Sequence, residues 1–532
     1  MTTQTKLIIR QLSMLPFEDF EEGLTSAELP EFRKAVKEIL QSPNMIYEQQ
    51  RDALEATAMR TLPYPSVSAE AKRLIQTEVI ELISEGGAPY HPRYVAPYYD
   101  RLLKQGSKFM ELAPAKDLYD AIVSLLTAYH YIPCAGLPVF IGRLDELLEP
   151  YINTVPSEAA HSILRSFWLM VDRLNPSAFV HANIGTRATK TGQLLLEIDY
   201  ELKTITNLSL RDDPLITPDD FALQAVRNQL AITKPYFVNH PLMVKDWGED
   251  YIIASCYNGM RLGGGIYTLV RLNFKEMVKH SDGTQQDVLE RVIPVAVRLL
   301  VEVVNSRIRY LIEENHWFDH SFWVEEGLLD PQKFTAYLGT FGLAEAINWL
   351  MAQNGRETAR YGSDSTANAL AEKMVKRVSE ELQKNPAVYC EGSHNQVTFH
   401  AQVGISTDVD LTPGVRIPAG EEPELYAQMA CEAALHTYIP GGCSVILEFD
   451  QTAEKNPMAV LDIAKGAMNQ GVRILSIGSS NSEFIRVTGY LIRRADLENA
   501  KREVKNRHSS AALGADFFET KPNNLHRRER KV

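Results

Sequence analysis

Arg486-Val487-Thr488-Gly489-Tyr490-Leu491-Ile492, near the C-terminus, is the stretch that decides the fold class. Before it, we expect a helix that begins at Asn456-Pro457 and ends at Gly471. Asparagine is a favoured N-cap, proline suits the first helical position, and glycine favours a helix end. Residues 472–477 are β-rich and predict a strand, which a short polar loop follows. Gly489 therefore lies just past a turn, where a strand glycine commonly marks a bulge or a close backbone approach.

The same stretch supports a sharper hypothesis through a resemblance. Arg-Val-Thr-Gly-Tyr-Leu resembles the C-terminal signature of the glycyl radical enzymes, in the form found in anaerobic (class III) ribonucleotide reductases. In that signature the glycine loses an α-hydrogen and stores a backbone radical. Glycine suits this role because an α-carbon without Cβ can become planar and can be approached closely. The resemblance implies a glycyl radical modification at Gly489 and no bound cofactor.

The resemblance also implies a cysteine that relays the radical to substrate from a loop inside a barrel. Only Cys256 has a suitable setting: the apolar Ile253-Ala254 leads into it, and a glycine-rich turn, Asn258 to Gly265, follows. This is the composition of a tight loop on a rigid support. We expect Cys134, Cys390 and Cys431 to be small buried residues. No two of the five cysteines have C-x-x-C spacing, so neither a zinc knuckle nor a thioredoxin-like motif is expected.

Three further stretches resemble parts of the same reductases or of their superfamily: residues 266–273, 335–346 and 438–443. The whole is similar to the YjjI family of glycyl radical enzymes. The fold this implies is a ten-stranded α/β barrel of two five-stranded half-barrels, surrounded by helices, with a helical N-terminal region. We expect an N-terminal region over 1–110, a barrel with the cysteine loop over 111–475, and a glycyl radical segment over 476–532.

Composition excludes several function classes. The chain has 532 residues, of which 45% are hydrophobic and 23% charged, enough for a large core. A formal net charge of −13 argues against a duplex nucleic-acid partner, which needs a basic face. The first twenty residues do not read as a signal peptide, and the most apolar stretch, 292–304, is interrupted by charges, so we expect no membrane span. Few, unpaired cysteines fit a reducing cytoplasm.

Periodicity gives a coarse map of the remaining elements. Residues 7–103 look mainly helical, with a tyrosine cluster at 90, 94, 98 and 99 that we interpret as an aromatic packing patch. Further helices are expected at 118–130, 161–171, 287–314 and 365–382, and strands at 194–200 and 397–405.

Other polar positions are candidates for contact with substrate. Residues 175–185 set His181 and Asn183 among apolar residues, and a strand that ends there can point them into a pocket; the alternative is a structural, hydrogen-bonded histidine. His316 and His320 are four residues apart but have no third ligand, so we expect no metal site. The three glycines at 263–265 lack the pattern of a phosphate loop or of a dinucleotide fold.

The resemblance implies a mechanism, and departures from it restrict the reaction. A radical-SAM activating enzyme would abstract hydrogen from Gly489, and Cys256 would then pass the radical to a small polar molecule under anaerobic conditions. Ser255 stands where pyruvate formate-lyase has a second cysteine. Asn258 stands where the dehydratase and decarboxylase branches have an acid/base glutamate, a role that an amide cannot fill. We therefore take Asn258, with His181 and Asn183, as a candidate substrate-binding residue.

Two alternative functions and the oligomeric state stay open. The nucleotide-sensing domain and the paired-cysteine zinc site of the anaerobic reductases are not visible, so a housekeeping reductase is not expected. A diverged reductase-like enzyme is one alternative, and a non-catalytic or radical-repair partner that retains the barrel is another. Because the sequence retains both the cysteine loop and the glycine segment, it favours an enzyme. A homodimer is compatible with this interpretation.

Overall fold

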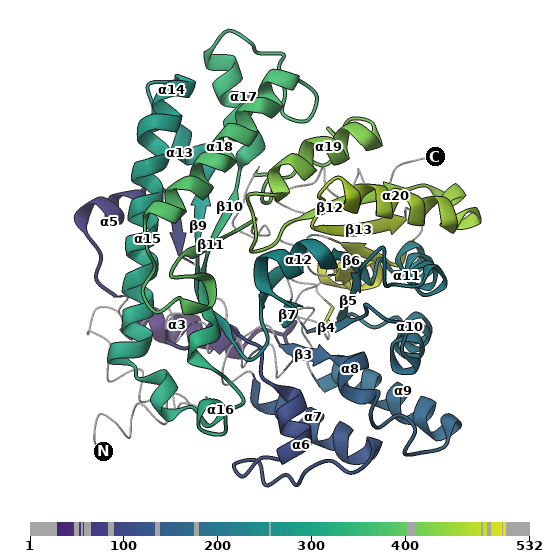
Figure 1. Cartoon of the computed structure of the whole chain (residues 1–532). Coiled ribbons are helices and arrows are strands. Elements are labelled where there is room, and N and C mark those ends of the chain that lie inside the picture. The colour runs from purple at the N-terminus through teal and green to yellow at the C-terminus, as the bar shows by residue number, and fades with distance from the viewer. Residues whose placement is uncertain are drawn as a thin grey trace.

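The chain is an α/β protein in which two sheets stand side by side and helices cover their outer faces, as the computed structural model shows (Figure 1). The structure describes residues 29–46, 50, 53–54, 57, 65–82, 90–132, 139–174, 180–254, 257–401, 411–479, 482–486, 491–502 and 504–506. Cys256 and Gly489 therefore lie outside the described residues.

The first sheet has five strands and is assembled around two parallel neighbours, β9 (Gly265–Asn273) and β10 (Phe334–Phe341). β11 (Val397–His400) runs parallel to β10 on its other side. β1 (Ile80–Leu82) and β2 (Tyr94–Val95) pair antiparallel with different parts of β9. Every residue of β9, β10 and β11 is buried, because the sheet is covered on both faces.

The second sheet has six strands in the order β12-β13-β6-β5-β4-β3. Its parallel block is built from four strands: β3 (Phe140–Arg143), β4 (His181–Ile184), β5 (Asn207–Asp212) and β6 (Tyr236–Asn239). β13 (Ile474–Ser479) lies antiparallel to β6 and parallel to β12 (Ser444–Phe449). Two strands from late in the sequence, β12 and β13, thus extend a sheet that begins near residue 140.

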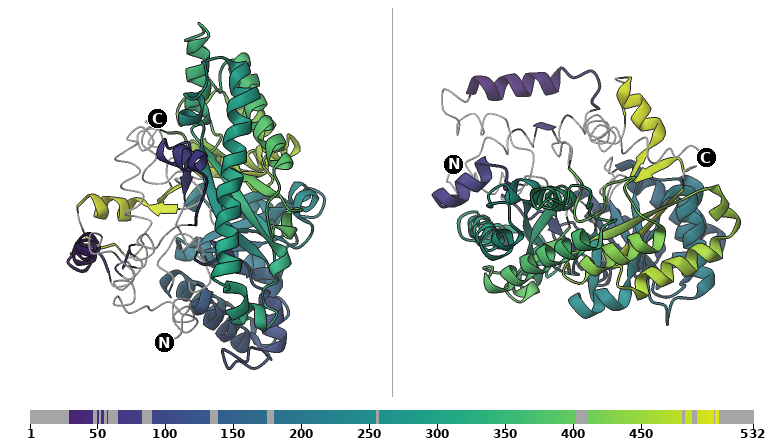
Figure 2. Two further views of the ribbon diagram at one scale, coloured as in Figure 1. Left: turned by 90° about the vertical axis from the view of Figure 1, so that its left-hand side faces the viewer. Right: turned by 90° about the horizontal axis from the view of Figure 1, so that it is seen from above.

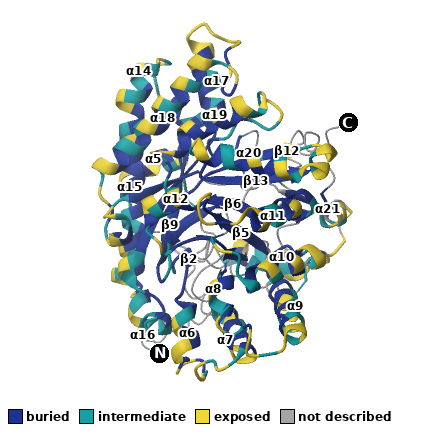
Figure 3. Ribbon diagram, turned by 45° about the vertical axis from the view of Figure 1, so that its right-hand side comes forward, coloured by how far each residue is buried: buried dark blue, intermediate teal, exposed yellow. Residues whose placement is uncertain are grey.

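In the middle of the six-stranded sheet, residues alternate between polar and apolar along β4 and along most of β5. Since successive side chains of a strand point to opposite faces, one face carries the apolar set and the other the polar set. The apolar face, which includes Ala182, Leu208 and Phe237, is turned to the surrounding helices. The polar face, which includes His181, Asn183, Asn207, Ser209 and Tyr236, is turned to the interior between the sheets, yet all of these residues are buried. Figure 3 shows the strands buried and the helices exposed on their outer sides.

Helices enclose both sheets. α15 (Ile293–Arg309) lies against β9 and α18 (Ser365–Lys384), and α11 (Asp219–Ile232) lies against β13 and α10 (Lys190–Leu202). The remaining described α-helices are α3 (Leu29–Leu40), α5 (Ala69–Gln76), α6 (Tyr99–Gln105), α7 (Leu118–Tyr131), α8 (Leu144–Leu148), α9 (Ser157–Leu174), α12 (His240–Trp247), α13 (Phe274–Val278), α14 (Gln285–Asp287), α16 (Phe322–Glu325), α17 (Leu343–Gln353), α19 (Leu425–His436), α20 (Pro457–Asn469) and α21 (Arg494–Lys501).

The C-terminal elements dock against the C-terminal ends of α10 and α11, two of the helices that cover the six-stranded sheet. β14 (Phe484–Arg486) and β15 (Leu491–Arg493) form an antiparallel hairpin that leads into α21. Ser482 Oγ donates to the Ala231 carbonyl at 3.1 Å, and Arg493 Nη2 donates to the Lys203 carbonyl at 2.6 Å. α21 and the N-terminal α3 lie on the same side of the barrel (Figure 2). The first and the last described helix thus lie over one face of the barrel.

Most of the expected elements are confirmed. The helix expected between Asn456 and Gly471 is α20, whose N-cap Asn456 accepts from the Ala459 N–H. Residues 287–314 are helical throughout, with π-helical turns at both ends of α15. The strand expected at 194–200 is wrong, because those residues lie in α10. There Leu195, Leu196, Ile198 and Asp199 are buried, whereas Tyr200 is exposed, which is a helical burial pattern that a short apolar run conceals.

The α/β class and the two-sheet barrel are confirmed, while the count of ten strands is not: one sheet has the expected five strands and the other has six. The described part of the N-terminal region contains β1 and β2 besides its helices, and β13 runs across the expected boundary at residue 475. The division into three regions stays a prediction. No helix within the described ranges is long and apolar enough to span a bilayer.

Candidate active site

A two-stranded hairpin lies between the sheets and is part of neither. β7 (Tyr251–Ala254) and β8 (Asn258–Arg261) pair antiparallel, with Ile253 opposite Gly259 and Ala254 opposite Asn258. The chain positions between these strands are 255–257, so the predicted radical cysteine belongs to the connection of a hairpin. Figure 1 shows β7 between the two sheets. The two strands that precede and follow Cys256 in the sequence thus both lie in the interior, while the finger loop itself stays a prediction.

Asn183 on β4 holds one side of this hairpin. Its Nδ2 donates to the Ile253 carbonyl at 2.8 Å and to Ser209 Oγ at 2.8 Å, and its Oδ1 accepts from the Ile253 N–H at 2.9 Å. The side chain thereby replaces a neighbouring strand for that one residue. Asn183 is fully buried, and both of its donor hydrogens are engaged.

The opposite side of the hairpin is held from the five-stranded sheet and from the loop before β12. Tyr337 on β10 donates its hydroxyl to the Gly259 carbonyl, and the Gly259 N–H donates to the Gly441 carbonyl at 3.0 Å. Burial raises the pKa of Tyr337, so the phenol keeps its proton at neutral pH. Sequence analysis did not single out Tyr337, although it stands inside the stretch 335–346 that carries part of the resemblance.

Gly442 permits the closest approach to the hairpin tip. Its φ is +116°, and a Cβ built there would lie 1.8 Å from the Tyr257 carbonyl oxygen. Tyr257, which directly follows Cys256, itself has a φ of 65°. Gly442 of the resemblance motif is thus required because the loop passes against the main chain of the residue that follows the predicted radical cysteine.

Asn258 lies at the base of the connection and is fully buried. Its Nδ2 is 3.3 Å from the Tyr94 hydroxyl and 3.2 Å from the Ala254 carbonyl. Its Oδ1 has no hydrogen-bond partner among the described residues. Arg93 Nη2 donates to the same Tyr94 hydroxyl at 3.1 Å. One tyrosine of the expected packing patch therefore also has a polar role, which its place beside Arg93 could have suggested.

His181 belongs to a hydrogen-bonded cluster on the inner face of the six-stranded sheet. Its ring nitrogens lie 3.0 and 3.1 Å from the Tyr236 hydroxyl, and Nε2 lies 3.4 Å from Ser209 Oγ. The Tyr236 ring stacks edge-on with Tyr257 at 5.1 Å. His181 is thus linked to the hairpin connection through Tyr236, which contacts both His181 and Tyr257. These hydrogen bonds fit the structural role of His181 that was the alternative in the sequence. A contact between His181 and substrate stays a prediction.

His400 on β11 is a further buried polar residue beside the hairpin that sequence analysis missed. Its Nδ1 lies 3.0 Å from the Gly441 carbonyl, so Nδ1 carries the proton that is donated. The His400 ring lies 5.2 Å from the Tyr337 ring. Nothing in a strand pattern of alternating residues marks such a histidine in advance.

The three glycines at 263–265 form the exit from the hairpin. A Cβ at Gly263, where φ is +80°, would lie 2.0 Å from the Tyr98 ring, and one at Gly265 would lie 2.2 Å from the Tyr94 carbonyl. The glycines let β9 begin in contact with the segment that contains β2. Close backbone packing therefore explains a motif that resembles a phosphate loop only in composition.

Gly489 is one of four residues between Arg486 and Leu491, which pair across the β14–β15 hairpin. β13, the strand that precedes this hairpin, reaches the cysteine hairpin as well, since Ser476 Oγ lies 3.4 Å from the Tyr257 hydroxyl. The distance between Cys256 Sγ and the Gly489 α-carbon concerns residues outside the described ranges. Their partnership therefore stays a prediction.

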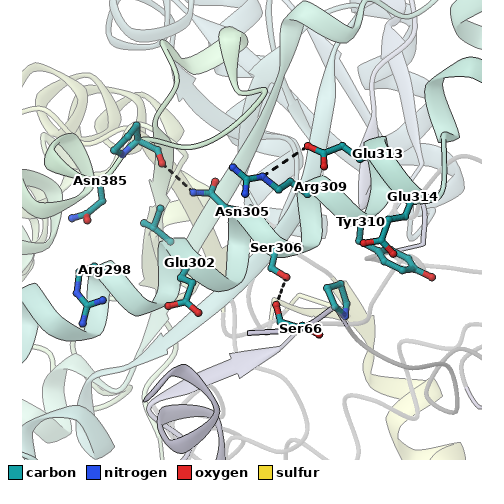
Figure 4. A pocket seen from close by; sticks show the side chains of 13 residues that line it. Ser66, Arg298, Glu302, Asn305, Ser306, Arg309, Tyr310, Glu313, Glu314 and Asn385 are labelled. Carbon is teal, nitrogen blue, oxygen red and sulfur yellow. Dashed lines mark hydrogen bonds and ion pairs between the residues drawn. The ribbon is translucent and has the colours of Figure 1, made fainter. Parts of the chain in front are cut away.

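Two other features do not belong to this centre. His316 precedes a 3-10 turn, Trp317–His320, so the two histidines are not on one α-helical face, and within the described ranges no cluster of three His, Cys, Asp or Glu residues could hold a metal ion. A groove of about 730 Å³ runs along the outer side of α15 (Figure 4). It is lined partly by paired groups, such as Arg309 with Glu313, and by none of the predicted site residues.

Comparisons with known proteins match most of the chain to one protein family. The model of a family described as glycyl radical enzyme YjjI-like matches residues 45–531. An uncharacterized protein of Escherichia coli (strain K12), YjjI, is 38% identical over 470 residues, which cover 88% of this chain and 90% of that protein.

Solved structures match the fold. The anaerobic ribonucleotide reductase from Thermotoga maritima, with glycerol in its active site, superposes with a TM-score of 0.64 at 11% identity, over 90% of each chain. A Roseburia inulinivorans protein described for 1,2-propanediol dehydration superposes with a TM-score of 0.67 at 12% identity, over 91% of this chain and 88% of that one. At such low identity these likenesses concern the fold alone. The family model that matches most of the sequence and the relative that is 38% identical establish that the chain belongs to the YjjI-like family of glycyl radical enzymes.

Proposed function

We propose that this enzyme stores a radical on Gly489 and carries it to substrate through a thiyl radical on Cys256. The observation that carries the proposal is the hairpin, which brings the residues flanking Cys256 into an interior lined by buried polar side chains. Ala254 and Tyr257, on either side of the connection, are both 1% exposed. An enclosed interior suits radical chemistry because oxygen and water would quench the intermediates.

Each hydrogen transfer in the proposed cycle conserves atoms and electrons. An activating enzyme first removes one hydrogen atom from the Gly489 α-carbon. In each turnover the Gly489 radical takes the hydrogen atom of the Cys256 thiol, which restores glycine and leaves a thiyl radical. The thiyl radical then takes a hydrogen atom from a carbon of the substrate. After the substrate radical has rearranged, the same hydrogen returns through Cys256, and Gly489 becomes the radical again.

The polar residues near the hairpin support a small polar substrate. Asn258 offers an amide rather than a carboxylate, so it can orient a substrate but cannot accept its proton. Its Oδ1 accepts no hydrogen bond from a described residue, and this supports the predicted contact between Asn258 and substrate. The substrate contacts of His181 and Asn183 remain predictions. Ser255, in place of a second cysteine, speaks against acyl-thioester chemistry.

Two alternatives carry different expectations. A diverged reductase-like enzyme would act on a ribonucleotide, and its fold would be the same. A radical-repair partner would form the glycyl radical but would convert no metabolite. Retention of both the cysteine hairpin and the glycine segment favours catalysis by this chain itself.

The proposed chemistry also requires an activating partner and suitable conditions. Glycyl radical enzymes are in general activated by radical-SAM enzymes, so we expect such a partner here, and we expect anaerobic conditions and a cytoplasmic location. A homodimer remains a prediction that size-exclusion chromatography with light scattering would check.

Electron paramagnetic resonance after anaerobic activation tests the proposal. We expect a glycine-centred doublet in the wild type, no such signal in Gly489→Ala, and a signal without substrate conversion in Cys256→Ser. The absence of the signal from activated wild-type protein would refute the proposal. A stable signal with no change in any compound of a metabolite extract would favour the repair partner.

A further inference from the structure

No third strand in the described part of the chain pairs with the cysteine hairpin to extend it into a larger sheet. β7 and β8 pair only with each other, yet the residues of both strands are buried apart from the half-buried Arg261. Buried N–H and C=O groups are almost always paired, so the outward groups of this hairpin must find partners elsewhere. Their partners determine where the connection that contains Cys256 sits.

One rung of the hairpin is held completely from outside. Ile253 and Gly259 face each other, and their four main-chain polar groups point away from the hairpin, as they do in a non-hydrogen-bonded antiparallel pair. Asn183 takes both groups of Ile253. Tyr337 takes the carbonyl of Gly259, and the Gly441 carbonyl takes its N–H.

The three partners come from different parts of the barrel. Asn183 lies on β4 of the six-stranded sheet, Tyr337 lies on β10 of the five-stranded sheet, and Gly441 lies in the loop before β12. The Ile253–Gly259 pair is therefore held by hydrogen bonds from both sheets of the barrel. Cys256 follows Ile253 by three residues, at most about 10 Å of extended chain, so a shift of the rung moves the connection with it.

We propose that Asn183 and Tyr337 are positioning residues that set the place of the radical-carrying cysteine within the barrel. Asn183 is suited to this role because one amide supplies a donor and an acceptor in the spacing of a peptide group. Aspartate in its place would accept from the Ile253 N–H but would repel the Ile253 carbonyl. Tyr337 acts only through its hydroxyl. This role rests on the proposed function, in which Cys256 transfers hydrogen, but the suspension of the hairpin can be tested without radical chemistry.

Alkylation of the inactive protein provides that test. Under anaerobic, reducing conditions, iodoacetamide labelling of each cysteine is followed by mass spectrometry. Because Ala254 and Tyr257 are buried, we expect Cys256 to be labelled only when the hairpin opens. The described cysteines Cys390 and Cys443 serve as internal references, since burial raises the pKa of Cys390 and raises that of Cys443 to about 12, which keeps both thiols unreactive.

Four variants form two matched pairs. Tyr337→Phe is compared with Tyr129→Phe, which also removes one buried hydroxyl that donates to a strand carbonyl, that of Ile141. Asn183→Ala is compared with Asn228→Ala, which removes a buried amide that donates to the Leu196 carbonyl. The control residues lie on α7 and α11, outside the hairpin's contacts.

We expect labelling of Cys256 to become about tenfold faster in Tyr337→Phe and in Asn183→Ala, because a buried main-chain group left without a partner favours the open state. Labelling in the two controls should stay within about twofold of the wild type. Wild-type labelling rates in both Tyr337→Phe and Asn183→Ala would overturn the positioning role, whatever the spectroscopy shows. If the wild type instead forms no glycyl radical, the proposed function fails while the labelling rates still decide how the hairpin is held.

Discussion

Replacement of Gly442 by alanine is the sharpest test of the contact between the glycine loop and the cysteine hairpin. The added Cβ would lie 1.8 Å from the Tyr257 carbonyl oxygen, whereas real Cβ contacts essentially never fall below 3.0 Å. The two groups must therefore separate by at least 1.2 Å, which is 3.0 less 1.8 Å. The two atoms nearest to that Cβ, the carbonyl oxygen and carbon of Tyr257, belong to the main chain, so no flexible side chain can absorb the movement.

The φ of +116° at Gly442 adds to this displacement, because a residue with a side chain in such a conformation costs on the order of 1–3 kcal/mol. Tyr257 adjoins Cys256, so a shift of more than 1 Å reaches the predicted radical centre. A misplacement of about 1 Å can cost roughly 100-fold in rate. We expect Gly442→Ala to slow hydrogen transfer between Cys256 and Gly489 by about that factor while leaving radical formation unchanged.

Deuterium exchange of the radical signal measures this transfer without a known substrate. In D2O the thiol becomes S–D, and repeated transfer between Cys256 and Gly489 places deuterium on the glycine α-carbon. The doublet, which arises from the α-hydrogen, then collapses towards a singlet. The rate of collapse in activated Gly442→Ala is compared with the rate in the wild type.

Gly466→Ala is the matched control. Gly466 lies inside α20, and a Cβ there would meet nothing within 4 Å. The same substitution should raise stability by about 0.5–1 kcal/mol and leave the exchange rate unchanged. Exchange at the wild-type rate in Gly442→Ala would refute the inference that this loop and the hairpin tip are in rigid contact.

Two further predictions concern stability. Burial raises the pKa of Glu432 from 4.5 to about 7, so the folded wild type loses stability as pH rises from 4.5 to 7. Glu432→Gln lacks this loss, so we expect the variant to be more stable than the wild type by up to about 3 kcal/mol at pH 8 but not at pH 4.5. Urea midpoints of both proteins at the two pH values check this. Lys234 is fully buried and donates to Asp199 Oδ1 at 2.8 Å. Lys234→Met leaves that buried carboxylate without its cation and should cost about 3–5 kcal/mol, and a urea midpoint equal to that of the wild type would contradict this expectation.

The sequence by itself determined the features that depend on local chemistry. Asn456, Pro457 and Gly471 mark the ends of α20 because capping and backbone preferences act within a few residues. The glycine-rich stretch that follows the cysteine predicted a tight loop, because glycine is common where the chain must turn sharply. The run Leu194–Tyr200 was misjudged as a strand because seven mostly apolar residues fit either period, and burial by neighbouring helices decided for α10.

Only the tertiary structure decided what holds the hairpin. Asn183, Tyr337 and Gly441 are separated by more than a hundred residues in each step along the chain, and no spacing rule connects them. They act together because the polar faces of two sheets converge on a single rung, where buried main-chain groups require partners. Local patterns could predict that the cysteine lies on a tight loop. The residues that hold the flanking strands in place come together only when the barrel has formed around them.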